Sequence, residues 1–161
     1  MQWQLREVAS DFFETADYRC TTTTTLRASP DAVFYALAHD PSGWGEWNPG
    51  FSSKGRYITP PPQGRGSVRE VIMAGLRYTD TILQWEEPRH WAFCVSQAGA
   101  PFARALGEDY RITPDGDGSV VQWTIAMEPR LALRAMQPLM DAFLPRYFKR
   151  AMRNLDKKLS G

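Results

Sequence analysis

The feature that most constrains the fold is a run of short strand-like segments that ends in one long amphipathic helix. From residue 54 onward, segments rich in β-branched and aromatic residues alternate with turns that contain glycine and proline. Gly75 and the stretch Pro114–Gly118 are turn signals that predict hairpins. We therefore expect an antiparallel sheet in hairpin order, with strands over 54–59, 67–74, 77–85, 91–96, 104–113 and 120–127.

Residues 131–159 predict the long helix. Their apolar side chains recur at intervals of three and four, which places them on one face of a helix: Met136, Met140, Phe143, Tyr147, Ala151 and Leu155. Pro138 and Pro145 each lack a backbone N–H, so we expect a kink or a broken first segment. The helix proper is predicted to begin near Pro138.

The sequence before residue 54 predicts one more strand and a short helix. Residues 18–28 contain five consecutive threonines, which favour a strand. Ser29-Pro30-Asp31 then has the N-cap, the proline and the acidic residue of a helix start. Residues 1–17 predict a short helix or a tail packed on the rest of the chain, because Leu5, Val8 and Phe12 recur at helical spacing.

This order of elements predicts an internal cavity. A sheet of seven antiparallel strands twists and curls, and the final helix is the only element long enough to cover its concave face. A helix about 10 Å in diameter does not fill the space under so wide a sheet. We therefore expect a void between sheet and helix, filled by bulky side chains or by a ligand.

Four segments of the chain carry a resemblance to a known family. They are TLRASPDAVFYALAHDPSGWGEWNP (25–49), GRGSVRE (64–70), ILQWEEPRHWAF (82–93) and DYRITPDGDGSVVQWTI (109–125). They resemble the START-like (SRPBCC) superfamily, which includes polyketide cyclase/dehydrase-like and pollen-allergen-like proteins. The resemblance covers residues 18–159 and is a signal of fold more than of activity.

The resemblance implies an α+β helix-grip fold. In this fold a seven-stranded curved antiparallel sheet grips a long C-terminal helix, and two short helices follow the first strand. We expect one such domain over residues 18–161, preceded by an extension over residues 1–17.

The amino-acid composition limits which binding partners and which cellular compartment are expected. Nineteen basic and eighteen acidic side chains give a net charge of +1, which provides no electrostatic footprint for nucleic acid. No apolar run has the length of a membrane helix, and the first residues do not resemble a secretory signal, so a cytoplasmic protein is expected. Cys20 and Cys94 lie outside any metal-binding spacing, and free thiols are favoured over a disulfide. The oligomeric state, monomer or homodimer, stays open.

Three features identify candidate ligand contacts: side chains that alternation places on the inner face of the strands, the apolar stripe of the long helix, and two tryptophans after the first helix. These are Trp44, Trp47, Tyr78, Trp91, Phe93, Tyr110, Trp123, Met136, Met140, Phe143 and Tyr147. Trp44 and Trp47 have two interpretations: an entrance rim that contacts ligand, or a plug for one end of the fold, which is favoured because large aromatics are mostly core. Both interpretations place Trp47 at the start of the second strand and predict that it is the more buried.

The candidate catalytic residues are Asp80, Glu108 and Tyr110. Alternation along their strands places them on the same face as the apolar residues expected to point toward the cavity. A buried carboxyl with a raised pKa acts as a general acid or base in enolisation or dehydration. The alternative, which is favoured, pairs each carboxylate with an arginine such as Arg69, Arg77 or Arg104, or exposes it through a bulge. No metal site or nucleotide motif is present in the sequence, so no cofactor is expected.

Three functional hypotheses follow. The leading one is binding of a hydrophobic small molecule, such as a lipid, a polyketide-like compound or an isoprenoid, between sheet and helix. The second is a polyketide cyclase/aromatase or dehydratase that uses a buried carboxyl. The third is a small interaction or stress-response module with a filled cavity.

Overall fold

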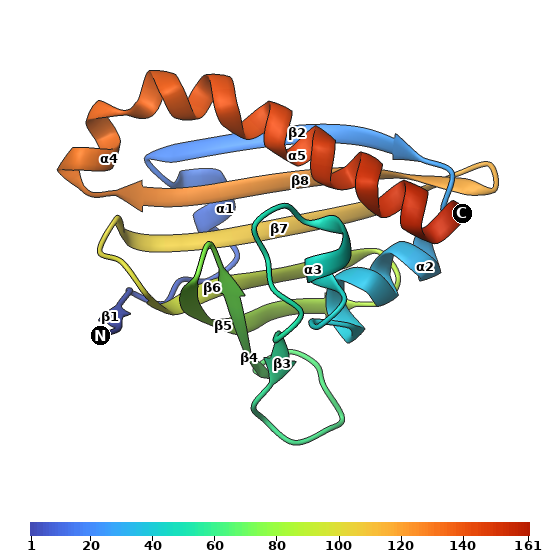
Figure 1. The fold of residues 1–161 in the computed structure, drawn as a ribbon, viewed down its shortest axis with the longest axis horizontal. Helices are drawn as coiled ribbons and strands as arrows, with labels where there is room; N and C mark the ends of the chain where they lie inside the picture. Colours follow the sequence, from blue (N-terminus) through green and yellow to red (C-terminus); the bar gives the residue numbers. More distant parts are fainter.

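The computed structural model describes residues 1–161 as a large curved sheet crossed by one long helix (Figure 1). The strands are β1 (Trp3–Gln4), β2 (Tyr18–Leu26), β3 (Arg56–Tyr57), β4 (Val68–Met73), β5 (Leu76–Glu86), β6 (His90–Ala98), β7 (Ala103–Asp115) and β8 (Gly118–Pro129). The helices are α1 (Phe12–Thr15), α2 (Pro30–Phe34) continued by a π-helical turn η1 (Tyr35–His39), α3 (Trp44–Trp47), α4 (Leu131–Ala135) and α5 (Gln137–Ser160).

The predicted α+β helix-grip architecture is confirmed. The strands run antiparallel in the order β2-β8-β7-β6-β5-β4-β3, so consecutive strands from β3 to β8 are hairpin neighbours. The turns at Gly75 and Gly116 adopt positive φ angles of 77° and 58°, which glycine adopts without strain. Strand β2 pairs with the last strand, β8, from Tyr18 opposite Met127 to Leu26 opposite Ser119.

The segment before β2 packs against the sheet and is mostly not helical. Only four of its residues form a helix, and Trp3–Gln4 form an eighth strand, β1, which pairs with β6 near Ala98. The segment then covers the sheet face opposite α5, where Phe12 and Phe13 pack in a second apolar cluster with small strand residues such as Ala92. The apolar residues at helical spacing therefore mark a packing surface, although most of the backbone around them is not helical.

The helix after β2 begins as predicted. The Ser29 hydroxyl accepts a hydrogen bond from the Ala32 backbone N–H at 3.3 Å, and Pro30 occupies the first turn. Trp47 differs from the prediction, because it belongs with Trp44 to the short helix α3 and does not begin a strand. They are equally buried, each 1% exposed, so the expectation that Trp47 is the more buried is wrong.

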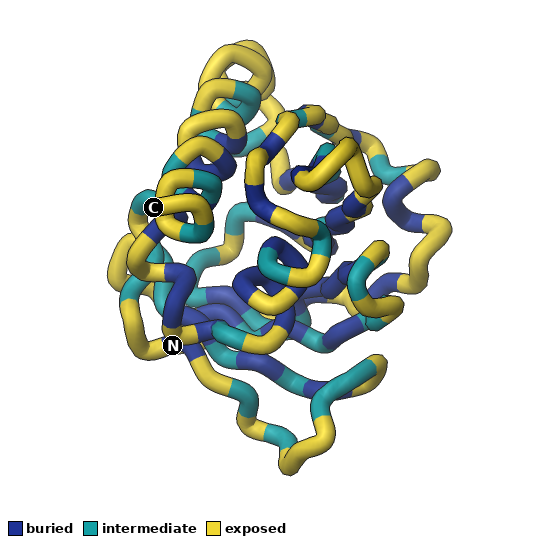
Figure 2. The backbone as a smooth tube through the Cα atoms, turned by 90° about the vertical axis from the view of Figure 1, so that its right-hand side faces the viewer, coloured by how far each residue is buried: buried dark blue, intermediate teal, exposed yellow.

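Helix α5 packs on the sheet along only its C-terminal half (Figure 2). Its buried residues are Phe148, Ala151, Met152 and Leu155. The predicted stripe continues toward the N-terminus, but Met136 and Phe143 are 50% and 61% exposed. The chain breaks at Met136 between α4 and α5, as the prolines suggested. The N-terminal half of α5 has no fully buried residue and contacts β2 through the hydrogen bond from the Tyr18 hydroxyl to Oδ1 of Asp141 at 3.0 Å. No helix in the structure has the length and apolarity needed to span a membrane.

Candidate functional site

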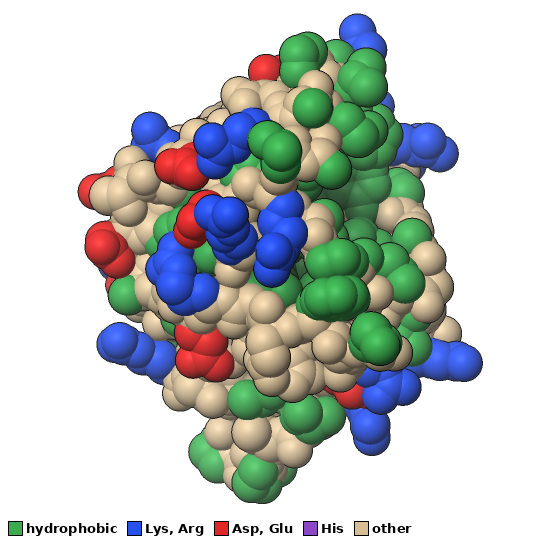
Figure 3. All heavy atoms as spheres, turned by 90° about the vertical axis from the view of Figure 1, so that its left-hand side faces the viewer, with side chains coloured by type: hydrophobic (Ala, Val, Ile, Leu, Met, Phe, Trp, Pro, Cys, Tyr) green, Lys and Arg blue, Asp and Glu red, His purple; other side chains and the backbone are tan.

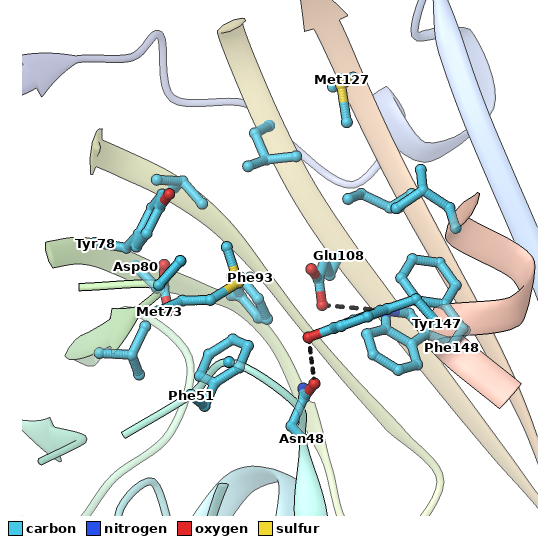
Figure 4. Close-up of a pocket in the computed structure, with 18 of the residues that line it drawn as sticks. Asn48, Phe51, Met73, Tyr78, Asp80, Phe93, Glu108, Met127, Tyr147 and Phe148 are labelled. Carbon is cyan, nitrogen blue, oxygen red and sulfur yellow. Dashed lines mark hydrogen bonds between the residues drawn. The ribbon is translucent and has the colours of Figure 1, made fainter. Parts of the chain in front are cut away.

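A cavity of about 330 Å³ lies between the sheet and the N-terminal half of α5 (Figure 4). It exists because α5 has fully buried side chains only from Phe148 onward. Before that residue the helix contacts β2 through the hydrogen bond from the Tyr18 hydroxyl to Oδ1 of Asp141 and otherwise lies over the cavity. Sixteen of the 22 lining residues are hydrophobic. They come from β4 to β8, from α5 and from the loop after α3, and include Phe51, Val71, Met73, Phe93, Val95, Phe102, Leu106, Trp123, Ile125, Met127, Phe143, Leu144 and Phe148.

One side of the cavity is bordered by the loop that follows α3 and by the β4–β5 turn. Pro49 and Ala74 contribute to the lining there, and Phe143 contributes to it from α5. Figure 3 shows a hollow bordered by hydrophobic side chains on one face of the molecule. Because Phe143 is exposed and also lines the cavity, its side chain marks the cavity mouth.

Asp80 contributes a carboxylate to the cavity wall, but the charge is paired. Asp80 on β5 lies directly opposite Arg69 on β4, and each side chain is 1% exposed. Arg69 donates two hydrogen bonds to Oδ2 of Asp80, from Nε at 3.0 Å and from Nη2 at 2.7 Å. Burial raises the pKa of the Asp80 carboxyl, and the guanidinium opposes that rise. This is a pairing with Arg69, one of the arginines named in the favoured alternative for the carboxylates.

Three aromatic rings enclose the guanidinium of Arg69. Its Cζ atom lies 4.6 Å from the ring centre of Trp44, 4.9 Å from that of Trp91 and 4.7 Å from that of Phe93. Cation–π contacts of this kind stabilise a desolvated guanidinium by about 2 kcal/mol. Trp44 therefore has a structural role: it covers the buried ion pair from the side of α3.

Glu108 is the second carboxyl of the cavity and has no cationic partner at hydrogen-bond distance. Its Oε2 atom accepts hydrogen bonds from the Tyr110 hydroxyl at 2.6 Å and from Nε1 of Trp123 at 3.1 Å. Its Oε1 atom takes no hydrogen bond from the protein and remains accessible (Figure 4). Burial raises the pKa of Glu108 to about 7, against the lowering effect of the Tyr110 hydrogen bond.

Tyr147 ties α5 to the loop after α3 at the edge of the cavity. Its hydroxyl lies 2.5 Å from Oδ1 of Asn48 and 2.7 Å from the carbonyl oxygen of Pro49, which are two acceptors for one proton. Further along α5, Asn154 donates a hydrogen bond to the carbonyl oxygen of Trp47 at 3.1 Å. The loop that borders the cavity is thus held by the helix on the opposite side.

The structure separates the predicted site residues into two groups. Seven line the cavity: Tyr78, Asp80, Phe93, Glu108, Trp123, Phe143 and Tyr147. Six lie outside its lining: Trp44, Trp47, Trp91, Tyr110, Met136 and Met140. Trp44, Trp47, Trp91 and Tyr110 are fully packed behind the wall, where Tyr110 stacks on Trp123 at 4.9 Å, whereas Met136 is exposed at the N-terminus of α5. The plug interpretation fits the burial of both tryptophans in α3.

Sequence reasoning missed several lining residues. Phe148 stacks on Trp123 with ring centres 4.0 Å apart, and its spacing from Leu144, Met152 and Leu155 is the signal that locates it on the buried face. Asn48 and Phe51 follow α3 in a loop, where alternation gives no information about direction. Alternation places Val71, Leu106 and Ile125 on the inner face of their strands. Their residue types are common in any protein core, so the sequence does not mark them as cavity residues.

Comparisons with known proteins agree with this geometry. The model of the family described as polyketide cyclase/dehydrase and lipid transport matches residues 18–160. An uncharacterized protein of Mycobacterium tuberculosis is 30% identical over 158 residues, which cover 95% of this chain and 93% of that protein. An uncharacterized protein of Mycobacterium bovis matches to the same extent.

Two solved structures illustrate the similarity of fold. A START superfamily protein from Mycobacterium smegmatis superposes with a TM-score of 0.70 at 16% identity, over 88% of this chain and 97% of that one. Ginseng major latex-like protein 151 from Panax ginseng gives a TM-score of 0.70 at 12% identity, over 90% and 99% of the two chains. The sheet, the long helix and the family match over 18–160 together show that this chain is a member of the polyketide cyclase/dehydrase and lipid transport family, with a START-like fold.

Proposed function

We propose that the protein reversibly binds a hydrophobic small molecule, such as a lipid, a polyketide-like compound or an isoprenoid, between the sheet and α5. The observation that carries the proposal is the apolar cavity of about 330 Å³, left where α5 stands away from the strands. Each 100 Å² of apolar guest surface buried there contributes about 2.5 kcal/mol. This open space favours ligand binding over the filled interior of the third hypothesis.

Native mass spectrometry of freshly purified protein tests this function. We expect a co-purifying lipophile, or uptake of an added neutral probe such as 1-aminoanthracene with enhanced fluorescence. Leu106→Trp and Ile125→Trp place an indole in the cavity and should reduce probe binding at least tenfold. Gln122→Trp, on the exposed face of β8, is the matched control and should bind like the original protein. Equal binding by all four proteins would exclude the cavity as the site.

Acid–base catalysis at Glu108 is a second candidate function. It is favoured by one observation, the free Oε1 atom of a carboxyl whose pKa burial raises to about 7. In an enolisation, the carboxylate would take a proton from the carbon next to a ketone, and the resulting acid would return a proton to the enolate oxygen. Asp80 is a weaker candidate, because its charge is committed to Arg69.

Deuterium exchange into a cyclic ketone in heavy water tests the catalytic candidate. We expect Glu108→Gln to abolish any protein-dependent exchange while cooperative unfolding and probe binding are retained. Exchange that persists in Glu108→Gln would exclude Glu108 as the base, and absence of exchange from the original protein would leave binding alone as the function.

A further inference from the structure

Glu108 is the one cavity side chain whose charge is unpaired and whose hydrogen-bonding capacity is half used. Oε2 is occupied by Tyr110 and Trp123, and these two contacts fix the carboxyl plane against β7 and β8. Oε1 has no protein partner and is accessible from the cavity (Figure 4). A guest that supplies a hydrogen-bonding atom there satisfies the group, whereas a wholly apolar guest leaves it unsatisfied.

The cavity contains no cation that is available to a guest. Arg69 already pairs with Asp80, three aromatic rings enclose its guanidinium, and its unpartnered Nη1 atom is fully buried. The other charged or titratable groups that act on Glu108 are Asp80, Tyr110 and Tyr147, which carry no positive charge. An anionic guest would therefore lose its hydration and meet a carboxyl group without gaining an ion pair.

We propose that Glu108 is the recognition group for the polar end of the ligand, and that the ligand is a neutral amphiphile. Its chemistry is an apolar body ending in one alcohol or ketone oxygen, and molecules ending in a carboxylate are selected against. The inference rests on the proposed function, because it assigns a chemical class to the guest of the same cavity.

The two kinds of neutral ligand respond differently to pH. A ketone oxygen only accepts hydrogen bonds, so it requires the protonated form of Glu108 as donor. An alcohol both donates and accepts, so it binds either form. Since burial places the pKa of Glu108 at about 7, ketone affinity should fall as the pH rises through neutrality, while alcohol affinity should change little.

Displacement of 1-aminoanthracene by three twelve-carbon compounds tests the inference: 1-dodecanol, 2-dodecanone and dodecanoate, each at pH 6.0 and pH 8.5. For the original protein we expect dodecanol to bind at least tenfold more tightly than dodecanoate at both pH values. Dodecanone affinity should fall about tenfold or more from pH 6.0 to pH 8.5, following the loss of the protonated form. Glu108→Gln keeps an amide donor and should bind dodecanone equally at both pH values.

Glu14→Gln, at an exposed position of helix α1, is the matched control and should keep the pH dependence. The inference is overturned if dodecanoate binds as tightly as dodecanol, or if dodecanone affinity is independent of pH in the original protein. Both of these outcomes are measured on the original protein, so the test can be carried out even if Glu108→Gln fails to fold. If neither 1-aminoanthracene nor any twelve-carbon compound binds, the proposed function itself fails, and the inference fails with it.

Discussion

Trp123 on β8 and Phe148 on α5 stack with their ring centres 4.0 Å apart and their planes 15° from parallel. Phe148 is the first buried residue of α5 and also lines the cavity. The stack is therefore the boundary between the half of the helix that packs on the sheet and the half that covers the cavity. The place where α5 leaves the sheet sets the inner end of the ligand site.

Replacing Phe148 by alanine should destabilise the protein and extend the cavity. Truncation of a fully buried phenylalanine costs about 3–5 kcal/mol, because both the transfer free energy and the contacts around the new void are lost. Phe143→Ala is the matched control on the same helix; since its side chain is 61% exposed, a change of about 0.5 kcal/mol or less is expected. Urea denaturation measures both values, and equal losses would contradict the division of α5 into packed and free halves.

The fold is predictable from the sequence where its signals are local. The Ser29 cap, the hairpin turns and the strand alternation depend on near neighbours, and the strands and helices they predict are present. Tyr78, Asp80 and Glu108 also line the cavity as parity indicates, because a strand side chain has only two possible directions. Hydrophobic periodicity likewise places the long C-terminal helix.

Features that depend on contacts between distant segments could not be predicted from the sequence. The apolar stripe of α5 continues from Leu155 to Met136, so composition does not reveal that the helix leaves the sheet at Phe148. The partner of Asp80 depends on the register of β4 against β5, which selects Arg69. The position of Trp44 over the Arg69 guanidinium depends on how α3 packs against the sheet. Neither the spacing nor the types of the residues in α3 predict that packing.

Asp80→Asn should be strongly destabilising, because it leaves the Arg69 charge buried without a partner. Breaking a buried ion pair from one side costs about 3–5 kcal/mol. The double variant Arg69→Met/Asp80→Leu removes both charges and should recover most of this loss, since apolar replacements of buried pairs are often neutral. Chemical denaturation of the three proteins gives the comparison. A double variant as unstable as Asp80→Asn would show that the aromatic enclosure, rather than charge balance, dominates.

Glu108 should make stability depend on pH between about 4 and 7. Burial raises its pKa to about 7 in the folded protein, above the value of about 4.3 for an exposed glutamate. The folded state therefore holds a proton that the unfolded state has lost, so the contribution is fully present below pH 4.3 and lost as the pH rises to 7. We expect the unfolding free energy of the original protein to fall by up to about 4 kcal/mol relative to Glu108→Gln over this range. Parallel pH profiles of the two proteins would contradict the assignment.

Tyr147→Phe should loosen the mouth of the cavity while leaving the fold intact. The hydroxyl joins α5 to Asn48 and Pro49, and its loss removes a hydrogen bond worth about 1 kcal/mol. If the loop after α3 must move for a guest to pass, that loss should accelerate dissociation of 1-aminoanthracene about fivefold. Stopped-flow dilution measures the rate. Tyr35→Phe is the matched control, because the Tyr35 side chain is 59% exposed and lies on η1. An unchanged dissociation rate in Tyr147→Phe would mean that guests enter along α5 beside Phe143, without displacement of this loop.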